Sequence, residues 1–228
     1  MSTPAGGPDR WLFDLWSRFY DIPAVQRAAY WPVHDAVLAA LGERPVRRLL
    51  DLGCGTGQLA DRLQRELRGT RVVGCDFSVG MLAQAARRGR RVRWVRGDAQ
   101  RLPFANGSFD AVTTTEAFHW FPDQRRALAE CRRVLAPNGR LLLAAASPPF
   151  AALADAAAAA SRVIGQPFRW PTAEEVKEMI AAAGFRVDSQ RRIFRLPGVL
   201  MMPVLTVATA VPGRPGRTSA RRGRPTPS

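Results

Sequence analysis

Cysteine is scarce in this chain, whose 228 residues include only Cys54, Cys75 and Cys131. An odd number without a paired pattern argues against a disulfide framework. None of the spacings is the close CxxC pair of a structural zinc site. We therefore expect no bound metal, and we expect the three thiols to be reduced and mostly buried, as in a cytoplasmic protein.

A long hydrophobic run is also missing. The longest apolar stretch, from Gly198 to Val211, is interrupted by Pro203 and is shorter than the roughly 20 residues needed to cross a bilayer. The N-terminus has neither the basic start nor the apolar segment of a secretory signal. These absences predict a cytoplasmic protein with no membrane span.

Lysine is nearly absent, since Lys177 is the only one among 34 basic residues, against 19 acidic residues. The net charge of +15 would suit a polyanionic partner such as RNA, DNA or an anionic membrane surface. Abundant arginine together with alanine, glycine and proline is also what a GC-rich genome imposes, and the arginines form no clear stripe. We favour the compositional origin, so nucleic acid is the second choice of partner.

Segments of strand and helix character alternate through most of the chain. The apolar patterns predict strands at residues 47–52, 71–75, 92–95, 109–114 and 141–145. They predict helices at residues 59–67, after a capping Ser78, and from Pro122 to about Leu135, with a turn at Pro137-Asn138-Gly139. This alternation predicts an α/β, Rossmann-like, doubly wound and mostly parallel sheet with helices on both faces.

The alternation stops after the fifth strand. An alanine-rich helix is expected at residues 150–164, and a capping box at Thr172–Glu175 opens a helix that stops at Gly184. Strands at residues 186–194 and 199–209 then follow with no room for a helix between them, so they must be antiparallel. The sheet is therefore expected to have seven strands and to end in a C-terminal antiparallel hairpin.

The chain is long enough for one domain with a sizeable core, expected at residues 10–211. This domain would begin with a helical cap at residues 10–45, made of two amphipathic helices at 11–20 and 26–41. Residues 1–9 and the basic tail at 212–228 have the composition of disordered segments.

A glycine cluster, Gly53-Cys54-Gly55-Thr56-Gly57, follows the first expected strand. Glycines let the backbone turn sharply and approach a ligand closely, and the carboxyl end of the first strand is where such sheets bind nucleotides. Gln58 stands where a dinucleotide-binding GxGxxG needs glycine, and no P-loop lysine follows. An acid at the end of the next strand could accept hydrogen bonds from ribose hydroxyls, and Asp76 lies there, about 20 residues on.

These residues make the chain resemble a known family, the class I S-adenosylmethionine-dependent methyltransferases. The most similar subgroup is the type 11 set, which includes quinone-biosynthesis and trans-aconitate methyltransferases. The resemblance covers about Tyr20 to Thr209 and rests on the order and spacing of five stretches: Leu49–Gly57, Val73–Leu82, Gly97–Phe104, Phe109–Val112 and Arg133–Leu141.

The resemblance implies S-adenosyl-L-methionine as cofactor. Asp98 would bind the adenine amino group, and Phe77 and Met81 would flank the ring or simply pack a helix on the sheet. Asp51 would hold the glycine loop and reach the methionine amine indirectly, or be purely structural. The residues implied to bind the cofactor are Asp51, Gly53, Cys54, Gly55, Thr56, Gly57, Asp76, Phe77, Met81, Asp98, Ala99 and Thr115.

His119 is the catalytic candidate, because it lies just past the fourth strand, near the place expected for the transferred methyl group. A neutral imidazole could take a proton from an acceptor hydroxyl or acid, or the side chain could simply shape the pocket. His34, the only other histidine, is expected on the surface of the second helix. Tyr20 resembles a tyrosine that caps the cofactor in quinone-type enzymes, or it packs its own helix.

The leading hypothesis is methyl transfer by in-line displacement to a small, apolar or aromatic acceptor, in a narrow pocket lined by groups such as Trp16, Phe118 and Trp120. The basic charge favours an RNA or protein methyltransferase instead. However, no separate RNA-binding module is visible, and no Asn-Pro-Pro-Tyr-like motif follows the fourth strand. A third reading is a non-catalytic protein that binds S-adenosylmethionine.

Overall fold

A computed structural model describes residues 30–163, 169–193 and 202–212 of the chain. The helix expected at residues 11–20, with Trp16 and Tyr20, lies outside these ranges. So do residues 1–9 and the tail from residue 213 onward. Among the described residues, every helix is too short or too polar to cross a membrane.

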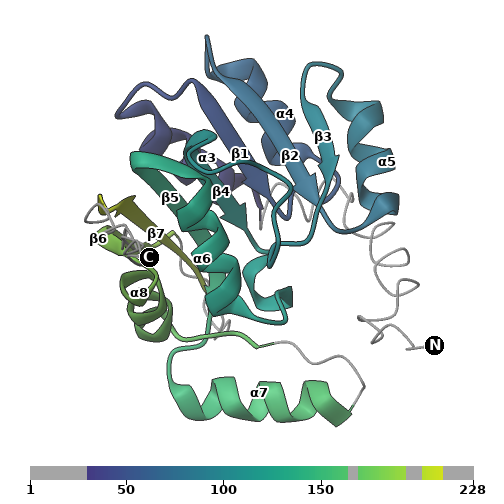
Figure 1. The fold of residues 1–228 in the computed structure, drawn as a ribbon. Helices are drawn as coiled ribbons and strands as arrows, with labels where there is room; N and C mark the ends of the chain where they lie inside the picture. Colours follow the sequence, from purple (N-terminus) through teal and green to yellow (C-terminus); the bar gives the residue numbers. More distant parts are fainter. Residues whose placement is uncertain (1–29, 164–168, 194–201, 213–228) are drawn as a thin grey trace, which may run out of the picture.

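A seven-stranded sheet forms the centre of the molecule, in the order β3-β2-β1-β4-β5-β7-β6 (Figure 1). The first five strands run parallel, and β7 pairs antiparallel with both β5 and β6. The Rossmann-like sheet and its C-terminal antiparallel hairpin are therefore confirmed. The strands are β1 (Arg48–Leu52), β2 (Arg71–Asp76), β3 (Arg93–Arg96), β4 (Phe109–Thr115), β5 (Leu135–Ser147), β6 (Phe185–Arg192) and β7 (Met202–Ala210).

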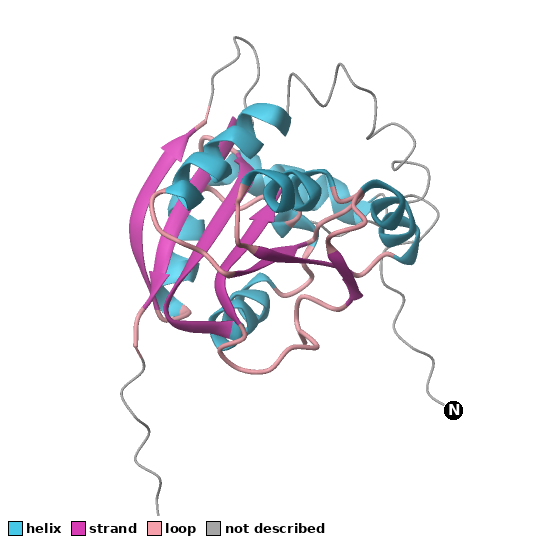
Figure 2. Cartoon of the chain, turned by 90° about the horizontal axis from the view of Figure 1, so that it is seen from above, coloured by secondary structure: helices cyan, strands magenta, loops and turns pink. Residues whose placement is uncertain are grey.

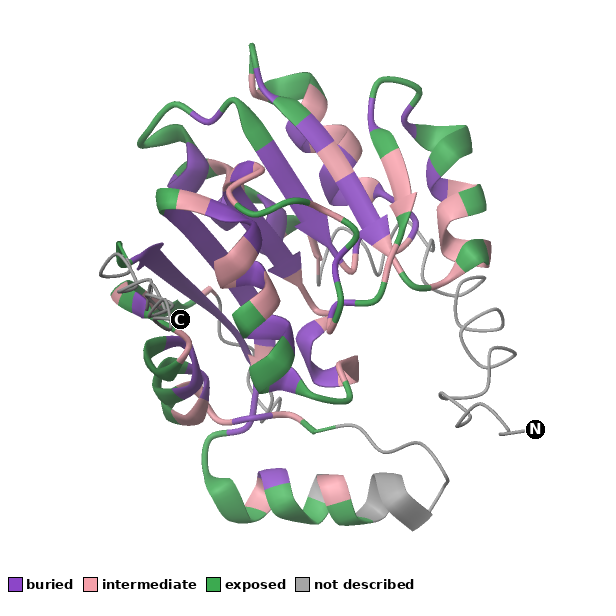
Figure 3. Ribbon diagram, viewed as in Figure 1, coloured by how far each residue is buried: buried purple, intermediate pink, exposed green. Residues whose placement is uncertain are grey.

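Helices cover both faces of the sheet (Figure 2). The helices are α3 (Trp31–Gly42), α4 (Gln58–Glu66), α5 (Val79–Arg88), α6 (Gln124–Val134), α7 (Ala151–Val163) and α8 (Ala173–Ala182), with a 3-10 turn η2 (Phe118–Trp120) after β4; α7 lies apart from the two faces, beyond the carboxyl edge of the sheet (Figure 1). Apolar side chains of α3 and α4 pack on one face, and those of α6 and α8 pack on the other. Successive side chains of β1 point to opposite faces of the sheet. Leu49 packs on the face covered by α3 and α4, and Leu50 packs on the face covered by α6 and α8. The inner strands β1, β4, β5 and β7 are accordingly buried along most of their length, whereas the edge strands β3 and β6 are largely exposed or half-buried (Figure 3).

Local capping signals place the helices well. Ser78 accepts a hydrogen bond from the amide of Met81 at the start of α5, and Thr172 and Glu175 form the expected capping box of α8. Pro122 does not start its helix, however. Asp123 is the N-cap of α6, because its side chain accepts from the amide of Arg126.

The turn expected at Pro137-Asn138-Gly139 is instead part of β5. Leu135 already pairs with Phe109, and the register then shifts before Arg140 pairs with Ala111. Asn138 has a positive φ of 60°, a conformation that asparagine tolerates better than most residues. The turn-forming residues therefore make an irregularity inside a longer strand, because both of its ends pair with β4.

The expectation that His34 lies on the surface is wrong. Its side chain is only 6% exposed and packs on the buried side of α3 with Val37 and Leu41, which lie three and seven residues further along the same helix face. Burial, and secondarily the charge of Arg62, lower the pKa of His34 to about 4. The side chain is therefore neutral at neutral pH.

Acid is expected to destabilise the fold through His34. Because the histidine pKa is about 6.5 in an unfolded chain and about 4 when folded, the unfolded state binds a proton first as the pH falls. The contribution of neutral His34 to the free energy of unfolding is complete above pH 6.5 and is lost as the pH falls toward 4. In urea unfolding, the wild type should lose about 2 kcal/mol more than His34→Leu between pH 7 and pH 5. Equal losses in the two proteins would contradict this account.

Candidate active site

Acidic residues gather at the carboxyl edge of the sheet in an otherwise basic protein. Asp51 lies near the end of β1, Asp76 ends β2, and Asp98 follows β3. β1 lies between β2 and β4 in the strand order, so the order in which successive strands are added reverses there, and crevices at such switch points bind ligands. The edge therefore offers negative charge and hydrogen-bond acceptors.

The three motif glycines all have positive φ, but only one of them faces open space. A Cβ atom added to Gly53 would lie 2.4 Å from the Cβ of Ala117, and one added to Gly57 would lie 2.4 Å from the indole of Trp94. At Gly55, an added Cβ would meet nothing within 4 Å. Gly53 and Gly57 are therefore required for packing, whereas the bare Cα of Gly55 leaves room for a ligand.

Trp94 on β3 packs against this loop, a role that its position in the sequence does not indicate. Its indole lies against Gly57 and Gly74, and its Nε1 donates to the carbonyl oxygen of Gly89 at 3.0 Å. The glycines were visible in the sequence, but their convergence on one indole depends on how β2, β3 and α5 pack. The Trp94 side chain thus holds the glycine loop in position against β2 and β3.

The carboxylate of Asp76 is held in a defined orientation. Its Oδ2 accepts from the amide of Gly55 and its Oδ1 from the amide of Ser78, both at 2.8 Å. Burial raises the pKa of Asp76, and these amides oppose the shift. Each oxygen keeps a further acceptor position, so the group can hold the glycine loop and still accept from a ligand hydroxyl.

Asp51 is buried beneath the loop, with 1% of its surface exposed. Its Oδ1 accepts from the hydroxyl of Thr113 on β4 at 2.9 Å, so it joins the two strands at the switch point. Burial raises the pKa of Asp51 to about 7, against the effect of the Thr113 hydrogen bond. A bound cation nearby would favour the ionised form.

Phe77 and Asp98 lie on the outer side of the same edge. The Phe77 ring is 55% exposed, and the guanidinium of Arg96 lies 5.8 Å from its centroid, so this ring does not pack a helix on the sheet. Asp98 is exposed, and its Oδ1 accepts from the amide of Gln100 at 2.8 Å. Ala99 is buried beside it, and Met81 is half-buried in the first turn of α5.

The rest of the loop is accounted for by protein contacts. Cys54 is buried, and burial raises its pKa, so it is an unreactive thiol. The carbonyl oxygen of Thr56 accepts from Nε of Arg88 at 3.2 Å. The three cysteines are free and buried, as expected.

S-adenosylmethionine fits this set of groups. Its ribose hydroxyls are donors and its sulfonium and ammonium groups are cations, which suits the three acids along the edge. The open Cα of Gly55 leaves room beside Asp76. Oδ2 of Asp51 is buried without a hydrogen-bond partner in the described part of the chain, as expected of a group whose partner is a ligand.

His119 lies in η2 between two indole rings. Its imidazole centroid is 5.0 Å from Trp120 and 5.2 Å from Trp170, and burial lowers its pKa to about 4. Its Nδ1 is buried and has no hydrogen-bond partner among the described residues. Phe118, expected to line the pocket, is buried in the core beside Phe121.

The segment before α8 is tied to η2. The amide of Arg169 donates to the carbonyl oxygen of His119 at 3.2 Å, and Nε2 of Gln124 donates to the carbonyl oxygens of Phe118 and Arg169. The hydroxyl of Ser147, at the end of β5, donates to the carbonyl oxygen of Pro171. These bonds hold Trp170 in place beside His119.

Glu116 is a second titratable group at this place that the sequence analysis did not select. It follows Thr115, the last residue of β4 and one of the expected cofactor contacts, and it has a positive φ of 51°. Its Oε2 accepts from the amide of Ala146 at 3.2 Å, and burial raises its pKa to about 7. The signal available in the sequence was an acid directly after the fourth strand.

Unsatisfied polar groups gather at one place in the fold. Within the described ranges, the buried side-chain nitrogen and oxygen atoms without a hydrogen-bond partner are Oδ2 of Asp51, Oγ1 of Thr114, Oε1 of Glu116 and Nδ1 of His119. All four residues lie at or just beyond the carboxyl ends of β1 and β4. Buried polar groups are normally paired, so this concentration marks the site.

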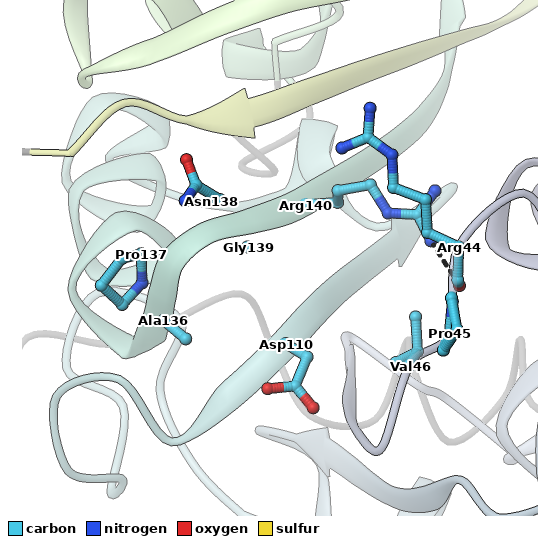
Figure 4. A pocket seen from close by; sticks show the side chains of 9 residues that line it. All are labelled: Arg44, Pro45, Val46, Asp110, Ala136, Pro137, Asn138, Gly139 and Arg140. Carbon is cyan, nitrogen blue, oxygen red and sulfur yellow. Dashed lines mark hydrogen bonds between the residues drawn. The ribbon is translucent and has the colours of Figure 1, made fainter.

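A shallow hollow lies at the opposite edge of the sheet, where β1 and β4 begin (Figure 4). Two of its charged side chains, Arg140 and Asp110, are engaged by other parts of the protein. Arg140 donates to the carbonyl oxygens of Ala40, Leu41 and Arg44, and Asp110 accepts from Arg48. These contacts close the C-terminal end of α3 against β5, which is a structural role.

Comparison with known proteins agrees with this geometry. The methyltransferase domain family (Methyltransf_11) matches residues 50–143. The demethylmenaquinone methyltransferase of Thermus thermophilus is 40% identical over 188 residues, covering 72% of this chain and 85% of that protein. The demethylmenaquinone methyltransferase of Beutenbergia cavernae is 48% identical over 142 residues, covering 60% and 58%.

The fold is shared more widely. The crystal structure of the [4+2]-cyclase SpnF superposes with a TM-score of 0.71 at 21% identity, covering 92% of this chain and 100% of that chain. At that identity the likeness supports the fold alone. Together with the sequence relatives and the motifs, it shows that the chain belongs to the class I S-adenosylmethionine-dependent methyltransferases, in the type 11 family.

Proposed function

We propose that this methyltransferase acts on a small, planar aromatic acceptor that carries ring hydroxyls, of the type its demethylmenaquinone methyltransferase relatives use. The observation that carries the proposal is the placement of His119 between Trp120 and Trp170, with its Nδ1 unpaired among the residues that the structure describes. Indole faces favour flat aromatic ligands, and an unpaired buried polar atom favours a ligand with a polar group at its edge.

The cofactor half of the proposal assigns roles to the residues at the ends of β1 to β4. Asp76 accepts from the ribose hydroxyls, Asp98 accepts from the adenine amino group, and Phe77 and Met81 flank the ring. Gly53, Cys54, Gly55, Thr56 and Gly57 provide the loop, and Asp51, Ala99 and Thr115 complete the contacts. When bound, S-adenosylmethionine supplies a methyl group already activated on a sulfonium.

The protein then has to orient the acceptor and exclude water. An in-line approach requires the acceptor atom about 3–3.5 Å from the methyl carbon, along the sulfur–carbon axis. Trp120 and Trp170 pack against His119 and hold its imidazole in one orientation, and His119 offers its Nδ1 to a ring hydroxyl. Because the pKa of His119 is held near 4, its imidazole stays neutral and serves as a hydrogen-bonding group.

The distribution of arginine supports a small acceptor over RNA. Near the site, Arg96 stacks on Phe77, Arg126 donates to the carbonyl oxygen of Gln100, and Arg169 pairs with Glu175. Elsewhere, arginines pair with acids on several elements: Arg48 with Asp110, Arg62 with Asp35 and Glu66, Arg133 with Glu130, and Arg186 with Asp188. Charges engaged in this way do not form one RNA-binding face.

The experiment is a transfer assay with methyl-labelled S-adenosylmethionine. A reduced, short-chain demethylnaphthoquinone should gain the label, while a random RNA should gain none. Asp76→Ala serves as the control that separates enzymatic from spontaneous transfer. Labelling of RNA, together with RNA binding that falls steeply with salt, would replace the small-molecule proposal with the RNA alternative.

A further inference from the structure

We propose that Glu116 is the general base of the reaction, taking the proton of the acceptor's ring hydroxyl, while His119 orients that hydroxyl. This inference rests on the proposed function and names the residue that performs its proton transfer.

The backbone places Glu116 between the cofactor loop and β5. Its amide donates to the carbonyl oxygen of Ala144 at 2.8 Å, which fixes it beside the end of β5. The next residue, Ala117, packs closely on Gly53, since a Cβ atom added to Gly53 would lie 2.4 Å from the Cβ of Ala117. Glu116 is therefore next to the loop that carries the cofactor, three residues before His119.

The local conformation of Glu116 is costly. A φ of 51° is rare for a residue that is neither glycine nor asparagine, and such strain is concentrated at functional sites. Within the described ranges, Asn138 is the other non-glycine residue with positive φ, and asparagine adopts that conformation more readily. A simple packing role would not require glutamate at this position.

Only one half of the carboxyl group has a partner. Oε2 accepts from the amide of Ala146, whereas Oε1 is buried with no hydrogen-bond partner in the part of the chain that the structure describes. Leaving a buried acceptor unpaired is unfavourable, and a donor supplied by the substrate would satisfy it. The hydroxyl of an acceptor ring bound beside His119 is such a donor.

The surroundings of Glu116 set its protonation near neutrality. Burial raises the pKa of this carboxyl to about 7, and the Ala146 amide opposes the shift. The ionisable groups on the adjoining elements are His119 on η2, Asp51 on β1, which bonds to Thr113, and Arg169 before α8, which pairs with Glu175. None of these charges is among the causes of the shift: burial raises the pKa, and the hydrogen bond from the Ala146 amide lowers it in part.

Glu116 is accordingly the better base of the two candidates. A general base works best when its pKa is close to the working pH. The carboxyl of Glu116, with a pKa near 7, meets this condition, whereas His119, with a pKa near 4, holds a transferred proton poorly. His119 instead accepts or donates a hydrogen bond as a neutral ring.

The proton and electron movements balance. The ring O–H bond breaks, its proton goes to Oε1 of Glu116, and its electron pair stays on the acceptor as a phenolate. That pair, at oxygen or at the adjacent ring carbon, forms the bond to the methyl carbon, while the sulfur–methyl bond breaks and its pair stays on sulfur. Methylation at oxygen leaves one proton on Glu116, which passes to solvent. Methylation at carbon is followed by loss of the ring proton and reprotonation of the oxygen, so the net release is the same.

The test compares Glu116→Gln with Glu178→Gln, in which an exposed glutamate outside the site is changed. With the reduced demethylnaphthoquinone probe, kcat/KM of the wild type should rise with pH through about 7. Glu116→Gln should lose this rise and at least about a hundredfold in kcat, with S-adenosylhomocysteine affinity unchanged. Glu178→Gln should match the wild type. Unchanged kcat and pH dependence in Glu116→Gln would overturn the proposal.

A second measurement needs no turnover. In protein labelled with carbon-13 in glutamate only, which separates Glu116 from Asp51, infrared spectroscopy should detect a carboxylic acid band that titrates near pH 7 and is absent in Glu116→Gln. A titration near the ordinary value of about 4.3 would overturn the proposal even if turnover falls. If the wild type methylates no aromatic probe, the proposed function fails, and the presence or absence of this band still decides whether Glu116 can act as a base.

Discussion

Gly55→Ala is expected to lose cofactor affinity while keeping the fold. The added Cβ would meet no protein atom within 4 Å, so the stability cost is limited to the left-handed backbone at φ +53°, about 1–2 kcal/mol. The methyl group would occupy the space beside Asp76 that we assign to S-adenosylmethionine. Calorimetry should show affinity for S-adenosylhomocysteine reduced by roughly tenfold to a hundredfold.

Gly69 provides a matched control for this substitution. It has a similar φ of +78°, and an added Cβ there also meets nothing within 4 Å, but it lies between α4 and β2, at the opposite edge of the sheet. Gly69→Ala should lose comparable stability and keep full affinity. If both variants bind S-adenosylhomocysteine as the wild type does, the ligand does not lie over Gly55.

Asp76→Ala is the second substitution with a large expected effect. It removes the acceptor for the ribose hydroxyls and releases the amides of Gly55 and Ser78, so the loop loses its anchor as well. Hydrogen bonds to charged groups contribute about 1.5–3 kcal/mol, which predicts an affinity loss of roughly tenfold to a hundredfold for both S-adenosylmethionine and S-adenosylhomocysteine.

The control for Asp76 is Asp35→Ala. Asp35 is an exposed partner of Arg62 on α3 and α4, and such surface pairs contribute little. It should bind the cofactor as the wild type does. An Asp76→Ala protein that keeps wild-type affinity would mean that the ribose lies elsewhere.

The fold could be predicted because its signals are local. Alternating strand and helix patterns gave the parallel sheet, and the short link between residues 194 and 199 required antiparallel strands. Two predicted details were wrong, because contacts with residues distant in the sequence override a local preference. The pairing of Leu135 with Phe109 carries Pro137-Asn138-Gly139 into β5, and the packing of α3 buries His34, although both segments look like turn or surface by composition.

The cluster of acids and glycines at the carboxyl edge of the sheet was predictable for a related reason. Its residues occur close together in sequence at strand ends, and the spacing between Gly57 and Asp76 reports one strand–helix–strand unit. The support beneath the loop was not predictable, because Trp94 meets Gly57 and Gly74 only after three strands have packed. Glu116 was equally hidden, since neither its left-handed backbone nor its unpaired oxygen is visible without the neighbouring β5.

The most direct test of the central claim is calorimetry of the purified wild type with S-adenosylhomocysteine and, separately, with NADH. The acids at the ends of β1 to β3, the open Gly55 and the absence of a third dinucleotide-type glycine at Gln58 predict micromolar binding of S-adenosylhomocysteine and no binding of NADH. Binding of NADH without binding of S-adenosylhomocysteine would contradict the assignment of this site.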